Sequence, residues 1–447
     1  MGELRDTWKE LLNRFDPDLP PRREWRAQRE DSPAQAIVAS LDRGLGRPER
    51  VLLSGTIGIG KSTELLRIAE ARALKGDEFV IVLDLVRHFR KVVGDLEALQ
   101  NVDSWEVCFL VGAALIRAAR ENLGYDFPPP QLTELGQAWT ALARASQPPE
   151  TPPPTIDLLA VVRTLSLMAS GAAAPAGAGI AGGLHALSEI AAAGKWYLPF
   201  GRRGTKPLED QDELMRTLVD KVNQLLATFQ RYNRRVLFVI DGLDRIVDGD
   251  RAKALFLHSQ MIARLDCCLV VCAPFALRSD MAAAEVRGFR LRTLHNAPVL
   301  DPKQPASHGQ GVEFLRQVYH CRVRDLAAES LVSSDELGRL AYYSGGRLRD
   351  FVRSIGMLAE RGFDDNAATA TSTHVDEVIR EARLLKETGL NRGHIDLLAA
   401  VARDPEHRLP HGPLARELLT WGRLLPYPNE SEWYYPHPLL TLNLVKP

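Results

Sequence analysis

Residues 55–63 read GTIGIGKST, and this stretch does more than any other to decide the fold. Its spacing is G-x-x-x-x-G-K-[ST], in which glycines let the backbone wrap a phosphate closely and point successive N–H groups at it. A helix that starts at the end of such a loop adds the positive end of its dipole. In this pattern Lys61 reaches the β- and γ-phosphates and the Ser62 hydroxyl holds Mg²⁺. We therefore predict a phosphate-binding loop whose nucleotide contacts come from Gly55, Gly58, Gly60, Lys61, Ser62 and Thr63.

The segments on either side of this loop have the order that phosphate binding requires. Residues 50–54 (RVLLS) have the pattern of a short buried strand. Residues 62–75 carry apolar side chains at helical spacing, including Leu65 and Ile68. Strand, loop and helix therefore follow one another, whereas the alternative of a glycine-rich turn with a chance lysine leaves this order unexplained.

A second apolar run ends in an acidic residue. Residues 235–244 read RVLFVIDGLD, and a β-branched run of this kind suits a strand buried on both faces of a parallel sheet. Ligands bind beyond the carboxyl ends of such strands. A carboxylate there can hold the water shell of Mg²⁺ beside the loop serine. We therefore predict that Asp241 and Ser62 bind the metal; the alternative is an aspartate that only caps the strand in a turn.

Length and composition describe an ordinary globular chain. The 447 residues allow about two to four domains, and 45% are hydrophobic and 25% charged. The net charge of −1 gives no global basic field of the kind that indicates nucleic-acid binding. An odd number of cysteines without a metal-type pattern suits a reducing compartment, and there is no apolar N-terminal signal region, so we expect a cytoplasmic protein. The cysteines are Cys108, Cys267, Cys268, Cys272 and Cys321.

Changes in pattern along the chain predict four parts. They are an N-terminal helical segment (1–32), a P-loop NTPase domain with a parallel sheet flanked by helices (33–304), a helical lid domain (305–390) and a small winged-helix-like module (391–447). In the second part we expect further strands at 79–85, 269–273 and 298–300, and helices at 104–123, 210–230 and 254–264. In the third part we expect helices at 312–319, 335–342, 347–361 and 375–386.

An insertion of about residues 127–207 interrupts the second part and is rich in proline, alanine and glycine. Within it, residues 164–184 carry no charge over a length that can span a membrane. Five glycines, one proline and few large apolar side chains make membrane insertion weakly favourable. We therefore predict a flexible or hairpin-forming insertion, with membrane contact as the alternative.

A glycine-rich stretch with two arginines lies at the centre of the predicted lid. Residues 344–351 read SGGRLRDF. A helix that opens with glycines and an arginine can aim the guanidinium at a γ-phosphate in the adjacent domain. We predict this catalytic and nucleotide-binding role first for Arg349 and then for Arg347. The alternative is an arginine that pairs with a surface carboxylate.

The last part of the chain has helices followed by aromatic strands. Residues 395–402 and 413–424 are predicted helices, and residues 425–435 are a predicted hairpin. This order is typical of a small winged-helix module, whose DNA-binding versions have a basic wing or recognition helix. Only Arg416 and Arg423 lie on the second helix. We therefore expect protein docking or autoinhibition here.

Three motifs together resemble a known group of proteins. They are GIGKSTELLR at 58–67, VIDGLD at 239–244 and GGRLRD at 345–350. They resemble bacterial P-loop ATPases near the STAND and origin-recognition-like AAA+ families, over roughly residues 33–390 without the insertion. The resemblance implies ATP with Mg²⁺, a nucleotide-gated switch from closed monomer to open homo-oligomer, and a role in bacterial immunity. STAND proteins usually carry fused sensor or effector repeats, so the resemblance implies a separate sensor or effector chain here.

The predicted catalytic residues depart from this group at one position. Many AAA+ ATPases have glutamate directly after the metal-binding aspartate, as the base for the attacking water, but this chain has Gly242. Asp244 is the nearest candidate for positioning water, with an ion pair to Arg245 or a helix N-cap as its alternative. We therefore expect slow hydrolysis with Lys61, Asp241, Asp244 and Arg349 as catalytic residues. A neighbouring copy can complete the site with one of Arg278, Arg287, Arg290 and Arg292.

Two other functions stay open at this stage. The first is a DNA-binding AAA+ ATPase of the origin-recognition or transposition-helper kind, which predicts steeply salt-dependent binding and is disfavoured by the near-neutral charge. The second is a membrane-associated ATPase, because DGLDR at 241–245 also resembles KAP-type ATPases with membrane segments between their nucleotide motifs. The glycine-rich insertion argues against that reading.

Overall fold

The computed structural model describes residues 2–19, 21–44, 47–145, 158, 162–163, 165, 167–170, 184–186, 211–232, 235–279, 286–326, 328–428 and 431–445. The chain forms two compact units. The sheet unit comprises Pro33–Ser54 and Glu64–Thr293, and the helical unit comprises Met1–Ser32, Gly55–Thr63 and Leu294–Pro447. The phosphate loop therefore groups with the N-terminal segment and the last third of the chain, although it is covalently continuous with the sheet on both sides.

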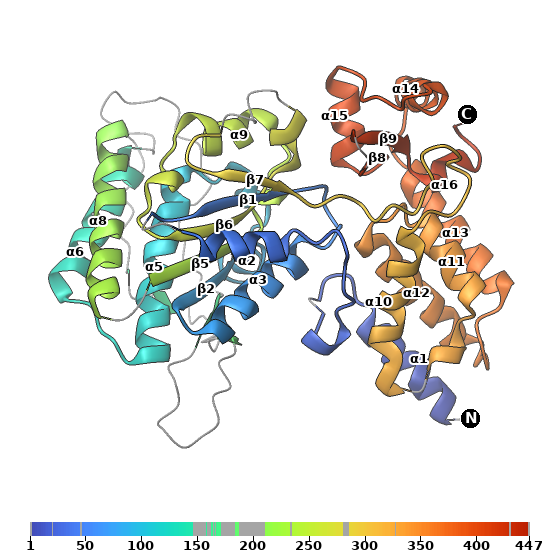
Figure 1. The fold of residues 1–447 in the computed structure, drawn as a ribbon, viewed down its shortest axis with the longest axis horizontal. Helices are drawn as coiled ribbons and strands as arrows, with labels where there is room; N and C mark the ends of the chain where they lie inside the picture. Colours follow the sequence, from blue (N-terminus) through green and yellow to red (C-terminus); the bar gives the residue numbers. More distant parts are fainter. Residues whose placement is uncertain are drawn as a thin grey trace. The chain divides into compact units, whose positions relative to one another are not determined.

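The sheet unit is built on seven strands in the order β4-β3-β2-β5-β6-β1-β7. Figure 1 labels β2, β5, β6, β1 and β7 of this sheet. Five of these strands are mutually parallel. They are β1 (Arg50–Ser54), β2 (Glu78–Asp84), β5 (Arg235–Asp241), β6 (Cys268–Ala273) and β7 (Arg290–Thr293). β3 (Leu167–Ser170) and β4 (Leu184–Ala186), both from the predicted insertion, pair antiparallel and extend the sheet beyond β2.

Four of the five predicted parallel strands are confirmed. β1, β2, β5 and β6 are apolar and almost wholly buried, so continuous hydrophobic runs identify them. The predicted strand at 298–300 is wrong: the fifth parallel strand is β7 (RLRT), and Leu300 makes only an isolated bridge to His308. β7 is a partly exposed edge strand with two arginines, which is why no apolar run marks it.

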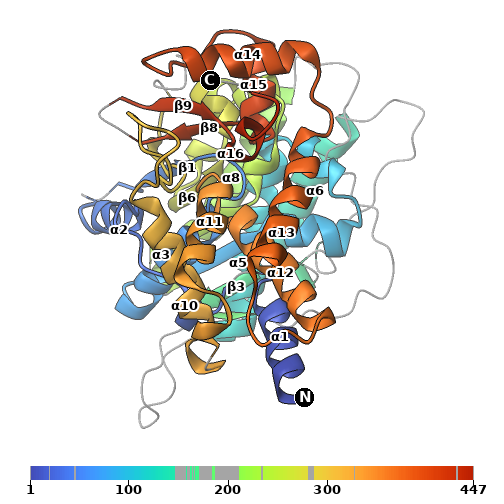
Figure 2. The same ribbon diagram turned by 90° about the vertical axis from the view of Figure 1, so that its right-hand side faces the viewer.

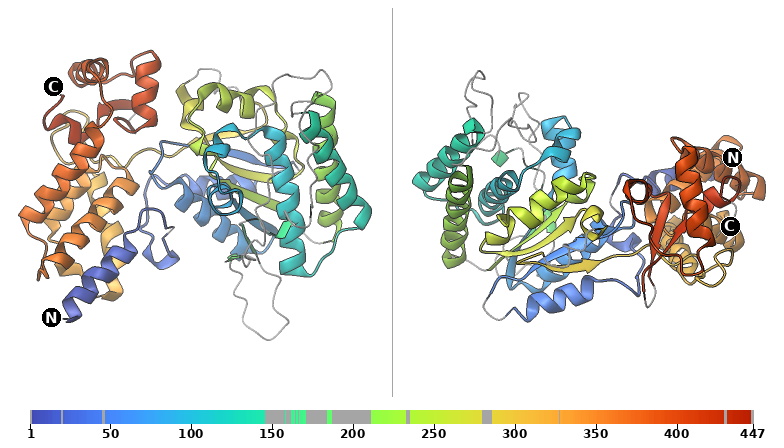
Figure 3. Two further views of the ribbon diagram at one scale, coloured as in Figure 1. Left: turned by 180° about the vertical axis from the view of Figure 1, so that it is seen from behind. Right: turned by 90° about the horizontal axis from the view of Figure 1, so that it is seen from above.

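Helices cover both faces of the sheet (Figure 3). α5 (Ser104–Leu123) and α8 (Gln211–Tyr232) lie on one face, and α2 (Ala34–Asp42) and α3 (Lys61–Lys75) lie on the other. α6 (Pro129–Ala145) packs against α8. α5 is buried over most of its length; it starts with an Asp103–Glu106 capping box and ends at Gly124 in the left-handed region. The predicted helix at 254–264 is wrong, because α9 (Gly249–Lys253) is followed there by a π turn and a 3-10 turn.

The helical unit contains the predicted lid helices and the N-terminal helix (Figure 2). The lid helices are α10 (Gly311–Val323), α11 (Ser334–Tyr343), α12 (Leu348–Asp364) and α13 (Ser372–Glu387). α1 (Gly2–Arg14) packs on α12, where Trp8 lies against Gly362 and its Nε1 donates to the Ala367 carbonyl at 2.8 Å. A Cβ at Gly362 would approach Trp8 within 2.5 Å, so glycine makes room for the indole.

The C-terminal part has the predicted order of helices followed by a hairpin. α14 (Arg392–Arg403) and α15 (Pro413–Thr420) precede the antiparallel pair β8 (Leu424–Tyr427) and β9 (Trp433–Pro436), and α16 (Pro438–Thr441) follows. The predicted fold class is confirmed: a mostly parallel α/β sheet is followed by a helical region and a small C-terminal strand pair. Among the helices of the described residues, none combines the length and apolarity needed to cross a bilayer. Most of residues 164–184 lie outside the described residues.

Candidate functional site

The predicted phosphate loop joins the end of β1 to the start of α3. Gly58 and Gly60 have φ angles of 91° and 104°, a region that side chains other than glycine rarely enter. At Gly55 a Cβ would lie 2.4 Å from Ile59 Cδ1 and 2.5 Å from the Leu294 carbonyl oxygen. Each of the three predicted glycines therefore occupies a position that a larger residue would distort.

Lys61 is folded into the loop. It is only 3% exposed, and its Nζ donates to the carbonyl oxygens of Gly55 at 2.8 Å and Thr56 at 2.7 Å. The ammonium is thus held against the first residues of the loop, on the first turn of α3. Ser62 is exposed and Thr63 half-buried on the same turn. A buried cation at a helix N-terminus is suited to an anion and costs free energy without one.

Three arginines hold the outer carbonyls of the loop. Arg347 Nη2 donates to Ile57 O at 2.6 Å, the Arg349 backbone N to Gly58 O at 2.8 Å, and Arg29 Nη1 to Ile59 O at 3.4 Å. In a planar trans peptide the C=O and the following N–H point in opposite directions. The N–H groups of residues 58–60 are therefore turned away from these arginines, as a loop that presents amides to a phosphate requires.

The two predicted lid arginines have different surroundings. The buried Arg347 side chain bonds the loop and donates to Asp350 Oδ2 at 2.9 Å. Arg349 contacts the loop through its backbone, and its guanidinium is half-buried, 3.9 Å from Asp18 Oδ1. The Arg349 side chain is 26% exposed, whereas that of Arg347 is 7% exposed.

Two residues that the sequence did not single out also anchor the loop. Asn296 is fully buried; its Oδ1 accepts from Thr56 Oγ1 at 3.2 Å, and its Nδ2 donates to the Pro426 carbonyl of β8 at 2.9 Å. Arg29 is also buried and donates to the His295 carbonyl at 2.5 Å as well as to the loop. Neither residue belongs to a motif, so no local signal could have found them.

In the sheet unit, acidic side chains gather at the carboxyl edge of the sheet. Ligand atoms of Asp241, Asp244 and Cys272 all lie within 4.8 Å of one another. Asp241 ends β5, Asp244 is in the 3-10 turn Leu243–Arg245, and Cys272 lies in β6. The two carboxylates suit Mg²⁺, which prefers oxygen ligands, whereas the buried thiol does not. This pair of acids therefore fits the predicted metal role.

The register of the sheet relates these acids to the end of β1. Leu53 of β1 pairs with Cys272 of β6, and the neighbouring Ile240 of β5 pairs with Val271. β1 and β5 therefore flank β6 and end at the same edge of the sheet. This is the edge where ligands bind in open α/β sheets.

A further carboxylate at this edge was missed by the sequence reasoning. Asp84 ends β2 and pairs in register with Asp241. Its Oδ1 accepts from the Arg87 backbone N at 2.9 Å and so caps α4 (Leu85–His88). Burial raises the pKa of the Asp84 carboxyl, against the effect of that hydrogen bond. The signal was present, because Asp84 ends an apolar run just as Asp241 does.

Any side chain at position 242, directly after Asp241, would clash with neighbouring atoms. Gly242 has a φ angle of 103°, and a Cβ there would lie 2.9 Å from the Val86 backbone N and 3.0 Å from Val86 Cγ2. The glutamate that many AAA+ ATPases carry at this point therefore has no room between β5 and α4. Asp244 lies one short turn further along the chain.

The arginines predicted to act on a neighbouring copy lie late in the sheet unit. Arg278 is in a 3-10 turn (Phe275–Ser279), Arg287 is exposed, and Arg290 and Arg292 are in β7. Arg290 Nε lies 3.1 Å from Glu49 Oε1. None of these positions by itself selects one arginine for a role in trans.

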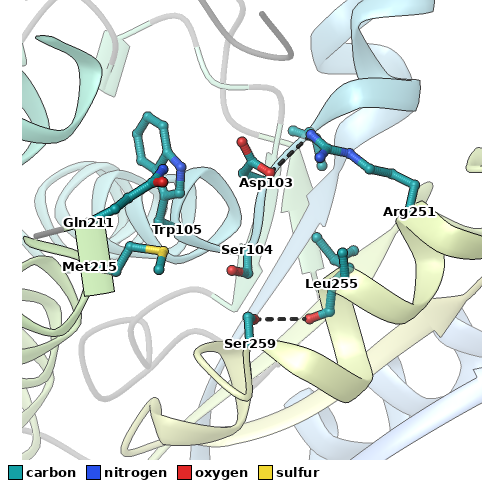
Figure 4. A pocket seen from close by; sticks show the side chains of 10 residues that line it. Asp103, Ser104, Trp105, Gln211, Met215, Arg251, Leu255 and Ser259 are labelled. Carbon is teal, nitrogen blue, oxygen red and sulfur yellow. Dashed lines mark hydrogen bonds and ion pairs between the residues drawn. The ribbon is translucent and has the colours of Figure 1, made fainter. Parts of the chain in front are cut away.

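The sheet unit also contains a small cavity at the start of α5 (Figure 4). Its volume is about 190 Å³, and Asp103, Trp105, Met215 and Arg251 are among its lining residues. Figure 4 shows the Arg251 guanidinium directed at Asp103, and the two charges are 2.9 Å apart. Its charged groups pair with each other, and none of the predicted nucleotide-site residues lines it.

We compared the chain with known protein families, curated proteins and solved structures. No protein-family model matches the chain, and no curated protein matches it. Among solved structures, Drosophila ORC bound to DNA matches at 10% identity and a TM-score of 0.41, over 97% of this chain and 89% of that one. The Aeropyrum pernix ORC2 protein in its ADP form matches at 12% and 0.42, over 96% and 94%. The Walker-type ATPase PABY2304 of Pyrococcus abyssi matches at 13% and 0.40, over 96% and 99%. At these identities and TM-scores, the matches support no conclusion about the fold or the activity of this chain.

Proposed function

We propose that this protein binds ATP with Mg²⁺ on the loop of residues 55–63 and hydrolyses it slowly. The observation that carries the proposal is the geometry of the loop itself. Gly58 and Gly60 have φ angles that favour glycine, the outer carbonyls are tied back by arginines, and Lys61 is buried inside the curve. A loop held in this way has paid the entropy of ordering before the phosphate arrives, and this favours tight binding.

The site residues have distinct roles in this proposal. The Lys61 ammonium and the amides of residues 58–60 bind the β- and γ-phosphates. Ser62 and Asp241 hold Mg²⁺, which when bound neutralises charge on the phosphates. Asp244 orients the attacking water, and the partly exposed Arg349 guanidinium reaches toward the γ-phosphate. Adenine is favoured over guanine by resemblance, because the chain has no N-K-x-D motif.

Slow turnover of ATP follows from the lack of a glutamate directly after Asp241. Since no side chain fits at Gly242, the usual glutamate base cannot be supplied from that position. General base catalysis typically contributes about 10²–10⁴-fold to a rate. An ATPase that must use Asp244 instead would keep ATP bound for long periods, which suits a switch better than a motor.

We further propose that the nucleotide controls assembly with other copies or with a separate effector or sensor chain. The loop is bonded to the N-terminal segment by Arg29, to the lid by Arg347 and to β8 through Asn296. Any rearrangement of the loop on binding nucleotide therefore acts on all three segments. A ligand needs about 5.5 kcal/mol of differential affinity to move such an equilibrium from 1:99 to 99:1. A role in bacterial defence rests on the resemblance to STAND proteins.

The test is the mass of the purified protein in solution without nucleotide, with ADP, and with a non-hydrolysable ATP analogue plus Mg²⁺. We expect a larger species only with the ATP analogue, and no such shift in Lys61→Ala. A wild-type protein that binds the analogue but stays monomeric would refute the self-assembly step. A wild-type protein with no measurable affinity for any nucleotide would refute the site assignment.

A further inference from the structure

A cluster of charged side chains contacts Arg347, the arginine that donates a hydrogen bond to the Ile57 carbonyl of the loop. Arg347 is 6% exposed, and its guanidinium bonds Ile57 O on one side and Asp350 on the other. Asp350 lies on the first turn of α12, and its side chain is 13% exposed. The hydrogen bond from Arg347 to the Ile57 carbonyl therefore depends on the position in which Asp350 holds the Arg347 guanidinium.

One oxygen of Asp350 collects the other partners of the cluster. Besides Arg347 Nη1 at 2.9 Å, Asp350 Oδ2 accepts from Lys386 Nζ of α13 at 2.8 Å. His437 Nε2, just before α16, lies 3.5 Å from the same oxygen. Arg347 and Lys386 therefore share one carboxylate oxygen, and a positive charge on Lys386 repels the Arg347 guanidinium and so weakens its attachment to Asp350.

The C-terminal part of the chain also packs against the Arg347 guanidinium. A Cβ at Gly422 would lie 2.3 Å from Arg347 Nη1, so the Gly422 backbone packs directly on this group. The next residue, Arg423, donates from Nε to the Lys386 carbonyl at 3.1 Å. Tyr427 of β8 donates from its hydroxyl to the Gly345 carbonyl at 2.9 Å. The position of Arg347 is therefore determined jointly by the lid and the C-terminal part.

The pKa values of Asp350, Lys386 and His437 are all lowered from their ordinary values. Burial raises the pKa of the Asp350 carboxyl, but Arg347, Lys386 and His437 outweigh that effect and hold it well below its usual range. Burial, and then Arg347 and Arg423, lower the pKa of Lys386 to about 7 against the pull of Asp350. Burial and Lys386 lower the pKa of His437 to about 3. Between pH 6 and 8, Lys386 is therefore the group of this cluster that titrates.

We propose that Asp350 is a positioning residue for nucleotide binding: it acts on the phosphate loop through Arg347, and the charge on Lys386 sets how firmly it does so. The inference rests on the proposed function, since it concerns the same loop. When Lys386 loses its proton, Arg347 is left as the one full cation on Asp350 Oδ2. The guanidinium is then held more firmly, Ile57 stays in place, and the loop needs less reordering to receive a phosphate.

The first experiment measures the dissociation constant of a fluorescent ADP derivative with Mg²⁺ from pH 6 to 8.5, on the full chain. It compares wild type with Lys386→Met, which has similar length and no charge. The ratio of the two constants cancels the titration of the ligand. We expect wild type to bind about fivefold more weakly than Lys386→Met at pH 6, the effect of one modest ion pair, and equally well above pH 8. A ratio of one at every pH would overturn the role of Lys386.

The second experiment moves Arg347 without changing any charge. Gly422→Ala places a methyl group against the guanidinium, and Gly389→Ala is its matched control, because Gly389 also has a positive φ (83° against 62°) but no atom within 4 Å of its Cβ position. We expect Gly422→Ala to bind the fluorescent ADP about tenfold more weakly than Gly389→Ala, the loss that follows when one charge-assisted hydrogen bond is removed. Equal affinity in two folded variants would overturn the role of Arg347. If Gly422→Ala does not fold, the pH series still decides the inference.

The two proposals fail in different ways. A wild-type protein that binds no nucleotide at any pH refutes the proposed function. A wild-type protein that binds ADP, but with the same affinity as Lys386→Met at every pH and no difference between the two glycine variants, refutes only the positioning role.

Discussion

Replacing Gly242 by alanine tests why this chain lacks the usual glutamate after Asp241. The new Cβ would lie 2.9 Å from the Val86 backbone N, closer than real Cβ contacts allow, and on a residue with a φ angle of 103°. The left-handed conformation costs a non-glycine residue about 1–2 kcal/mol. Overpacking against α4 adds about 1–3 kcal/mol. We therefore expect Gly242→Ala to lower the free energy of unfolding by about 2–5 kcal/mol.

Urea denaturation followed by circular dichroism measures this change. The matched control is Gly124→Ala, because Gly124 also has a positive φ of 64° but no atom within 4 Å of its Cβ position. Gly124→Ala should lose only the conformational term of about 1–2 kcal/mol. The difference between the two variants isolates the contact with Val86.

Gly242→Glu extends the test to function. We expect this variant to be at least as unstable as Gly242→Ala and no faster in ATP hydrolysis, because its side chain has no room beside α4. A stable Gly242→Glu variant with a raised turnover number would refute the steric reasoning. So would equal losses of stability in Gly242→Ala and Gly124→Ala.

Three further predictions concern single side chains. Lys61→Ala should weaken binding of an Mg²⁺–ATP analogue by about ten- to a hundredfold in calorimetric titration, since a charge-assisted hydrogen bond contributes about 1.5–3 kcal/mol; unchanged affinity would remove Lys61 from the site. Asp241→Asn should leave ADP binding without metal intact and abolish the gain in affinity that Mg²⁺ confers, and a gain equal to that of wild type would exclude Asp241 as a ligand. His88 is fully buried, and burial lowers its pKa to about 4, so below about pH 6.5 the unfolded state binds a proton that the folded state does not. As the pH falls from 6.5 to 4, the free energy of unfolding of wild type should therefore fall by about 3 kcal/mol more than that of His88→Leu. Parallel profiles of unfolding free energy against pH would contradict this.

The buried strands and the amphipathic helices could be read from the sequence because their signals are local. β1, β2, β5 and β6 are continuous apolar runs, α5 and the lid helices have helical periodicity, and α5 also starts with a capping box. β7 could not be predicted from the sequence, because a partly exposed edge strand needs no continuous apolar run. The helix expected at 254–264 failed because apolar spacing does not distinguish one helix from a series of short turns.

The sequence by itself predicted the phosphate loop, because close approach of backbone to phosphate requires glycine, lysine and serine at a fixed local spacing. It also determined the acid at the end of β5, because a carboxylate that follows an apolar run marks the carboxyl edge of a sheet. Only the tertiary structure decided what holds the loop. Arg29, Asn296 and Arg347 bond to it across 30, 240 and 290 residues of chain, and no periodicity encodes a pairing over such distances. The same holds for Gly242, whose need to be glycine comes from a neighbour on another element, Val86 of α4.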